Sequence, residues 1–369
     1  MSAASIVHVV ENHQLADLAA QWGEAPLLAL DTEFQRETTF YPIPGLVQLG
    51  DESHQYLIDP LTVDDWTPLQ RAFSNSAPKV LHACSEDLEI FEQLTGDMPQ
   101  PLFDTQVGAA LAGWGFSLSY QALVNTCLGI EIGKDHTRSD WLRRPLSAEQ
   151  CHYAALDVAY LPEMFARIAQ RLQQLDRFAW WEEEGARTAR ASREQIAPEN
   201  YYLKLSGAWR LRGPQMAVLQ QLCSWRETQA RARDVPRGRI VKDAQCIDIA
   251  RALPRTPSEL AALPELHPQV VRLEGETILT IVEGFRQVPA AECPPPMLAP
   301  LPREAGDQLK RLRRLVETRA LELDMPAEIL ARKRDCETLL RSGELSPALQ
   351  GWRYAIIGEP LLALYKTLG

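Results

Sequence analysis

Apolar residues in the first half of the chain come in short runs separated by polar turns. Residues 26–34 form a run that ends in acids, residues 46–59 form two runs around a polar turn, and residues 79–84 form a further run. Such runs are typical of buried strands, and the pair within 46–59 predicts a hairpin. Helical stretches follow the runs, beginning near Ser85, Asp104 and Ser147. This order predicts an α/β domain, a mixed sheet with flanking helices.

The second half has a different pattern. Residues 187–206 lose periodicity and predict a linker, whereas residues 207–287 are helical with short breaks at prolines. The proline-rich stretch 293–302 is too stiff and too poor in N–H donors to be helical. We therefore predict two small all-α domains after the α/β domain. The predicted boundaries are 1–195 for the α/β domain, 196–206 for a linker, 207–289 for the first helical domain, 290–302 for a proline-rich linker and 303–369 for the second helical domain.

Charge is divided unevenly between the two halves. Residues 1–200 contain 13 Lys and Arg against 29 Asp and Glu, a balance of −16. Residues 201–369 contain 25 against 20, a balance of +5. An acidic half tolerates a metal site, and a basic half suits a module that binds a polyanion.

Cellular location is indicated by three absences. The seven cysteines are scattered and never spaced as CxxC, which argues against a structural zinc or a disulfide framework. Residues 1–10 show no basic segment followed by an apolar run, so no secretory signal is visible. No uncharged apolar stretch approaches the roughly 18 residues that cross a bilayer. We expect a cytoplasmic protein with reduced thiols and no membrane contact.

Two pairs of side chains are placed to act together. Asp31 and Glu33 stand at the end of the first apolar run, and residues two apart on a strand point to the same face. Tyr153 and Asp157 are four residues apart on a predicted helix, which Ser147 begins with a capping box, and they share one helix face. Each pair alone also fits an ordinary half-buried surface.

Asp87 adds a further carboxylate just after the run 79–84. Ser85 can cap the helix that follows. Capping and the helix dipole would by themselves also explain the acids Glu86 and Asp87.

Taken together, these carboxylates predict a metal site formed by Asp31, Glu33, Asp87 and Asp157. Four carboxylates at the ends of adjacent elements repel one another unless cations hold them. Oxygen ligands alone favour Mg²⁺ or Mn²⁺ over zinc. Two such ions about 4 Å apart suit in-line phosphoryl displacement, in which one activates a water and the other stabilises the leaving oxygen. Tyr153, one turn before Asp157, can hold that water.

Three motifs resemble those of the DEDD exonucleases, in the subgroup whose third motif contains Tyr: Asp31–Phe34, His82–Phe91 and Tyr153–Asp157. The connecting sequence is similar to the ribonuclease D family, in the segments Phe40–Pro42, Gly45–Leu49, Phe103–Gln106, Ser139–Leu142 and Arg144–Leu146. Gly207–Leu211 opens a stretch that resembles a helicase-and-RNase-D C-terminal (HRDC) domain. The segment after Pro302 resembles a second copy more weakly.

This resemblance implies a ribonuclease H-like catalytic domain followed by two HRDC domains. It implies a 3′→5′ exoribonuclease that releases 5′-monophosphates and acts on transfer-RNA precursors and other small structured RNAs. It also implies two bound Mg²⁺ or Mn²⁺ ions and a water-positioning role for Tyr153. The metal-binding positions of the family are matched by Asp31, Glu33, Asp87 and Asp157.

Two basic groups are candidates for contact with RNA phosphates, although a solvated surface would explain either. The first group lies just before the helix of Asp157 and consists of Lys134, Arg138 and Arg143. The second group has helical spacing in the last segment and consists of Lys310, Arg311, Arg313, Arg314 and Arg319. We expect the helical half to grip RNA while the first half cuts it.

Two other functions remain open at this level. A 3′→5′ DNA exonuclease would use the same carboxylates. Selecting RNA over DNA requires a contact to the 2′-hydroxyl, and no single residue of the sequence indicates such a contact. A catalytically inactive RNA-binding adaptor is the other reading. It would be expected to lack one of the site residues, and all of them are present.

Overall fold

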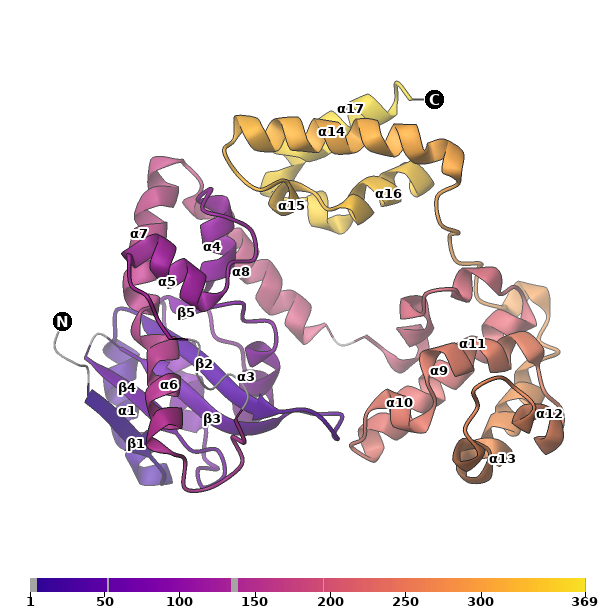
Figure 1. Cartoon of the computed structure of the whole chain (residues 1–369), viewed down its shortest axis with the longest axis horizontal. Coiled ribbons are helices and arrows are strands. Elements are labelled where there is room, and N and C mark those ends of the chain that lie inside the picture. The colour runs from indigo at the N-terminus through magenta and orange to yellow at the C-terminus, as the bar shows by residue number, and fades with distance from the viewer. Residues whose placement is uncertain (1–4, 52, 134–138, 195, 369) are drawn as a thin grey trace. The chain divides into compact units, whose positions relative to one another are not determined.

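The computed structural model describes residues 5–51, 53–133, 139–194 and 196–368 (Figure 1). Contacts divide the chain into a first unit, residues 1–35, 44–194 and 301–369, and a second unit, residues 36–43 and 195–300. No helix of the described residues is long and apolar enough to cross a membrane.

A mixed sheet of six strands, in the order β1-β4-β3-β2-β5-β6, lies at the centre of the first unit. The strands are β1 (Ser5–Val9), β2 (Leu28–Gln35), β3 (Ile43–Gly50), β4 (His54–Ile58), β5 (Lys79–Leu81) and β6 (Leu102–Asp104). β3 and β4 pair antiparallel, which confirms the predicted hairpin. β1 pairs with β4, β2 with β5 and β5 with β6, all in parallel.

Helices cover both faces of this sheet. Their bounds are α1 (Asn12–Glu24), α2 (Thr67–Phe73), α3 (Asp87–Thr95), α4 (Thr105–Leu111), α5 (Tyr120–Leu128), α6 (Ala148–Ala159), α7 (Leu161–Gln174) and α8 (Phe178–Arg193). Side chains alternate along β2: Leu28 and Leu30 pack in the core with α1, α2 and α3, whereas Ala29 packs in the core of α4 to α7. Positions 31 and 33 therefore face the same side as Ala29.

One helix start agrees with the sequence-based expectation and two other helix ends differ from it. α6 begins with the predicted capping box, in which Ser147 and Gln150 exchange hydrogen bonds. Ser85 does not cap α3, because the helix begins at Asp87 and its N-cap residue is Glu86. The linker expected from residue 187 was also wrong at its start, since α8 continues to Arg193.

Arg144 ties the segment before α6 to the sheet. Its Nε and Nη2 atoms donate to the two carboxylate oxygens of Asp59, at 2.5 and 2.6 Å. The same guanidinium donates to the carbonyl oxygens of Gly45 and Trp141, at 2.7 and 2.8 Å. Gly45 has no room for a side chain, because a Cβ there would lie 2.7 Å from that of Trp141. These contacts hold Trp141 beside α6.

The second unit is helical among the residues described. Its helices are α9 (Pro214–Ala232), α10 (Arg237–Ile240), α11 (Asp243–Ala252), α12 (Pro257–Ala261) and α13 (Pro268–Phe285), with short 3₁₀ turns η1 (Pro198–Lys204), η2 (Ala208–Arg210) and η3 (Ala290–Glu292). The loop after β2 packs in this unit through Phe40, which is buried with the helical core. The Asp234 carboxylate accepts hydrogen bonds from the backbone N–H groups of Phe40 and Tyr41, at 2.9 and 3.0 Å.

The last segment of the chain belongs to the first unit by its contacts. It contains η4 (Arg303–Ala305), α14 (Gly306–Glu322), α15 (Ala327–Leu330), α16 (Lys333–Ser342), η5 (Pro347–Leu349), the π-helical turn η6 (Tyr354–Gly358) and α17 (Glu359–Tyr365). Its buried residues share one hydrophobic cluster with those of α4 to α8. Trp180 of α8 stacks on Trp352, with ring centroids 4.4 Å apart and planes at 7°. The predicted domain boundaries at 196–206 and 290–302 stay predictions.

We predict that Arg144→Met lowers the thermal unfolding midpoint by several degrees, corresponding to about 3 kcal/mol, because it leaves the largely buried Asp59 carboxylate without its partner. Arg193→Met is the matched control, since Arg193 pairs with Asp97 at an exposed position and such pairs contribute under about 1 kcal/mol. Thermal unfolding measures both. Equal shifts in the two variants would contradict the role of Arg144.

Candidate active site

The acids of β2 lie where the strand's alternation places them. Asp31 and Glu33 point toward the face covered by α6, and both are partly buried. Thr32, between them, points to the opposite face and is buried. The sheet therefore presents two carboxylates on one side and a hydroxyl on the other.

The helix α6 brings the second pair to the same place. Carboxylate oxygens of Asp31, Glu33 and Asp157 all lie within 4.8 Å of one another. Tyr153, one turn earlier on α6, forms a hydrogen bond with the Asp157 carboxylate. The Tyr153 ring packs against Trp141, with centroids 6.1 Å apart. The structure thus brings together two predicted pairs that are more than a hundred residues apart in sequence.

Asp87 is the first residue of α3 and is buried. Its carboxylate accepts a hydrogen bond of 2.5 Å from the Thr32 hydroxyl. Asp87 also acts electrostatically on the other acids, because its negative charge raises the pKa values of Asp31, Glu33 and Asp157. It lies beside the group of three carboxylates and is held there by Thr32.

The turn that presents Asp87 is held by Asp104. Ala83, just after β5, has a φ of 55°, a left-handed conformation that is uncommon for a residue with a side chain. The Asp104 carboxylate accepts the N–H groups of Ala83 and Cys84, at 3.0 and 3.3 Å. It also caps α4 by accepting the N–H of Gln106, as its place before that helix predicts. One buried carboxylate therefore stabilises both the strained turn and the next helix.

Among the described residues, no ion pair with Lys or Arg balances the charges of Asp31, Glu33, Asp87 and Asp157. Burial raises the pKa of Asp31 well above its usual value, and repulsion by Asp87, Asp157 and Glu33 raises it further. Burial and the same kind of repulsion raise the pKa of Glu33 to about 8. For Asp157, burial raises the pKa although the hydrogen bond from Tyr153 opposes the shift.

The donor set fits a divalent cation. Every candidate ligand is a carboxylate oxygen, and such sets select hard cations over zinc or copper. The raised pKa values show that the negative charges destabilise one another, so a cation between them would remove a real electrostatic cost. The site therefore suits a divalent metal ion.

Tyr153 is a hydrogen-bonding group here and does not act as an anion. Burial raises the pKa of its hydroxyl above the usual value, and the neighbouring charges of Asp157, Glu33 and Asp31 raise it further. The hydroxyl therefore keeps its proton at neutral pH. It can donate to Asp157 and accept a hydrogen bond from a water through its oxygen.

The structure describes only some of the predicted RNA contacts. Lys134 and Arg138 lie outside the described residues, and Arg143 is exposed on the segment before α6. In α14 the cationic side chains are exposed or partly exposed, and three of them pair with acids on their own helix: Lys310 with Asp307, Arg313 with Glu317 and Arg319 with Glu322. Arg311 and Arg314 are exposed. Their contact with RNA stays a prediction.

Reasoning from the sequence did not assign a supporting role in the site to three residues. Thr32 and Asp104 hold Asp87 and its turn, as described above. The third is Tyr120, which is partly buried and whose hydroxyl donates to the carbonyl oxygen of Leu156 at 2.7 Å. Tyr120 thereby fixes α6 next to Asp157. The sequence contains no spacing signal for it, because the contact joins α5 to α6.

Comparisons with known proteins agree with this geometry. A family model described as 3′-5′ exonuclease matches residues 6–173, and an HRDC domain model matches residues 215–282. Ribonuclease D of Pseudomonas paraeruginosa is 42% identical over 98% of this chain and 98% of that protein. Ribonuclease D of Escherichia coli is 35% identical over 96% of each.

The fold comparison gives the same answer. The crystal structure of Escherichia coli RNase D, described as an exoribonuclease involved in structured RNA processing, aligns with a TM-score of 0.91 and 33% identity, covering 98% of this chain and 99% of that one. The predicted ribonuclease H-like domain with a helical C-terminal region is confirmed. The chain belongs to the ribonuclease D family and is a 3′→5′ exoribonuclease.

Proposed function

We propose that the chain removes nucleotides one at a time from RNA 3′ ends by hydrolysis assisted by two divalent cations, Mg²⁺ or Mn²⁺. Asp31, Glu33, Asp87 and Asp157 would hold the cations. The observation that carries this proposal is the group of three carboxylates within 4.8 Å, with Asp87 beside it and a tyrosine hydroxyl bonded to Asp157. We further propose that transfer-RNA precursors are among the substrates and that the protein acts in the cytoplasm.

The reaction joins a water oxygen to the phosphorus of the last phosphodiester and breaks the bond to the 3′-oxygen of the preceding nucleotide. The products are a nucleoside 5′-monophosphate and an RNA that is shorter by one nucleotide with a free 3′-hydroxyl. Bound divalent cations supply charge stabilisation for the attacking and leaving oxygens. Tyr153 orients the water through its hydroxyl oxygen, and Asp157 fixes that hydroxyl by accepting its proton in a hydrogen bond.

The decisive test follows the length of a 5′-labelled RNA over time, with and without a divalent cation. A DNA of the same sequence is run beside it. Shortening of the RNA in single-nucleotide steps, dependent on the cation, is the expected result. Equal cleavage rates on RNA and DNA would show that the substrate is nucleic acid in general and not RNA alone. A transfer-RNA precursor with a 3′ extension, compared with an unstructured RNA of equal length, tests the proposed substrate class.

We predict that Asp157→Asn lowers kcat at least 100-fold while the unfolding midpoint changes little, because the metal's charge stabilisation is worth several kcal/mol. Glu149→Gln is the matched control, since it removes an exposed carboxylate from the same helix. A rate for Asp157→Asn that equals that of the control would rule out Asp157 as a ligand.

Tyr153→Phe keeps the ring against Trp141 and removes only the hydroxyl. We expect kcat to fall by roughly 10²–10⁴, the range for a positioned group that handles a proton. Tyr354→Phe, at an exposed position of the same unit, is the control. If Tyr153→Phe loses thermal stability but keeps its kcat, the tyrosine serves packing alone.

The metal-free protein should become less stable as pH rises from about 5 to about 8. The carboxyl groups of the site have folded-state pKa values above their ordinary values, up to about 8 for Glu33, so the folded state binds more protons than the unfolded state in this window. Each such proton lowers the free energy of unfolding by about 1.4 kcal/mol per pH unit. Divalent cations should therefore raise the midpoint more at high pH than at low pH.

Thermal unfolding in a chelator, and separately in excess Mg²⁺ or Mn²⁺, measures this effect. The double variant Asp31→Asn/Glu33→Gln removes two of the titrating groups and should flatten both dependences. If the cation raises the unfolding midpoint equally at about pH 5 and about pH 8, a metal site built from these acids is contradicted.

A further inference from the structure

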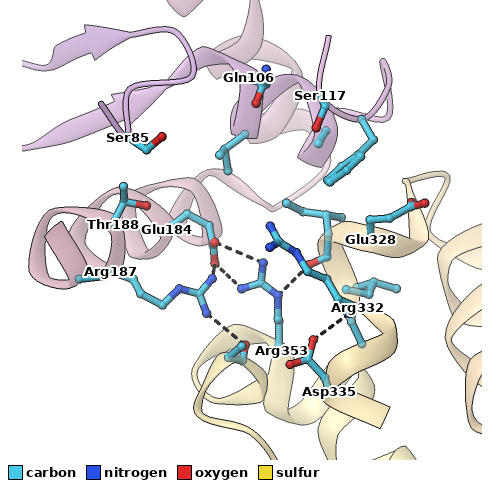
Figure 2. A pocket seen from close by; sticks show the side chains of 18 of the residues that line it. Ser85, Gln106, Ser117, Glu184, Arg187, Thr188, Glu328, Arg332, Asp335 and Arg353 are labelled. Atoms are coloured by element: carbon cyan, nitrogen blue, oxygen red, sulfur yellow. Dashed lines mark hydrogen bonds and ion pairs between the residues drawn. The ribbon is translucent and has the colours of Figure 1, made fainter. Parts of the chain in front are cut away.

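A groove of about 690 Å³ lies between the exonuclease part of the first unit and its last helical segment. One wall comes from the start of α3, from α4 with the loop after it, and from α8 (Figure 2). The other wall comes from α15 and α16 and the turn between them. The groove is therefore built by segments from opposite ends of the first unit.

Two of the four arginines that line the groove are engaged in joining its walls. Arg353 donates to the Glu184 carboxylate at 2.5 and 3.2 Å, and to the carbonyl oxygen of Ile329 at 2.7 Å. Arg187 also pairs with Glu184, and it donates to the carbonyl oxygen of Ala348 at 3.1 Å. Because these guanidinium groups are satisfied within the protein, they hold the two walls together and are not available for a ligand.

Arg332 and Arg334 line the same groove and are exposed. Within the described part of the chain, neither forms an ion pair with a carboxylate. Figure 2 shows the Arg332 side chain extending across the groove, toward the wall that carries Gln106 and Ser117. Lys333, between them in sequence, lies outside the groove lining and pairs with Glu337 at 3.4 Å. The free positive charge on this wall is thus aimed into the groove.

The facing wall offers the other contacts that a nucleic-acid strand uses. The Phe116 ring is 41% exposed, which provides an apolar face on which a base can stack. Hydroxyl groups from Ser85, Ser117 and Thr188 line the same wall and can bond ribose or phosphate oxygens. Guanidinium groups opposite an aromatic ring and hydroxyls are the combination found in grooves that bind single strands.

The exonuclease wall of the groove contains residues that neighbour the supports of the candidate active site. Ser85 stands two residues before Asp87 on the turn that Asp104 holds. In the loop after α4, Leu118 follows Ser117, and its carbonyl oxygen contacts His82 Nε2 at 3.1 Å. Tyr120, two residues further on, fixes α6 beside the carboxylates. A strand whose last nucleotide lies at the carboxylates can continue along this wall.

We propose that this groove binds the single-stranded RNA immediately 5′ of the nucleotide that is being removed. Arg332 and Arg334 contact backbone phosphates, and Phe116 stacks on a base. The last helical segment would then act on the substrate through α15 and α16, a surface distinct from the basic residues of α14. This inference rests on the proposed function, because it assumes that the 3′-terminal nucleotide lies at the carboxylates.

The test compares Arg332→Ala/Arg334→Ala with Lys333→Ala in the full-length protein. Binding of an RNA of about ten nucleotides is measured in an Asp157→Asn background, which prevents cleavage, and hydrolysis of a dinucleotide is measured with all carboxylates intact. The double variant should bind the longer RNA about tenfold or more weakly, with a salt slope reduced by about 0.7 for each lost phosphate contact. Lys333→Ala should resemble wild type. Dinucleotide hydrolysis should equal that of wild type in both variants.

Phe116→Leu provides a second measurement that leaves charge unchanged. It should weaken binding of the longer RNA about fivefold or more without altering the salt slope, since a stacked base is lost. Unchanged affinity for the longer RNA in the double variant overturns the groove as the RNA path, and so does an equal loss in Lys333→Ala. A wild-type protein that does not shorten the longer RNA in the presence of a divalent cation would overturn the proposed function itself, which is a separate result.

Discussion

Carboxyl groups that repel one another are confined on one face of the sheet, partly removed from water. Burial and mutual repulsion both disfavour their charged forms, as the raised pKa values of Asp31 and Glu33 show. The protein keeps these acids together because they are anchored to three rigid elements. Asp31 and Glu33 share a strand, Asp157 lies on α6, and Asp87 begins α3. The electrostatic cost is characteristic of a site whose stable state contains cations.

Most of the contacts near the site hold these elements in place, and few groups there neutralise the charge. Asp104 holds the turn before Asp87 through two backbone N–H groups, and Thr32 holds its carboxylate. Tyr120 and Trp141 contact α6 from neighbouring segments, Trp141 at its middle and Tyr120 nearer its C-terminal end. Arg144, on the segment before α6, is satisfied by Asp59 and by carbonyl oxygens. Among the described residues, no ion pair neutralises the carboxylates of the site, which suits a divalent cation.

The last helical segment has a structural role that is easily overlooked in a chain with repeated helical regions. It shares a hydrophobic cluster with α4 to α8, and Glu184 of α8 accepts from both Arg353 and the indole N–H of Trp352. Trp181, three residues before Glu184 on the same helix, donates its indole N–H to the carbonyl oxygen of Asp104 at 2.8 Å. Contacts of the last segment thus reach, through one helix, the residue that holds the turn of Asp87.

The sequence by itself determined the elements that have a local signal. Alternation placed Asp31 and Glu33 on one face, helical spacing paired Tyr153 with Asp157, and the capping box located the start of α6. The strands β1 and β6 were not predicted from the sequence. Only the tertiary structure decided which elements meet: the contact of Thr32 with Asp87, the clamp of Asp104 and the groove beside Arg332 join residues far apart in sequence. Their pairing depends on chain topology and packing, which no local pattern of residues encodes.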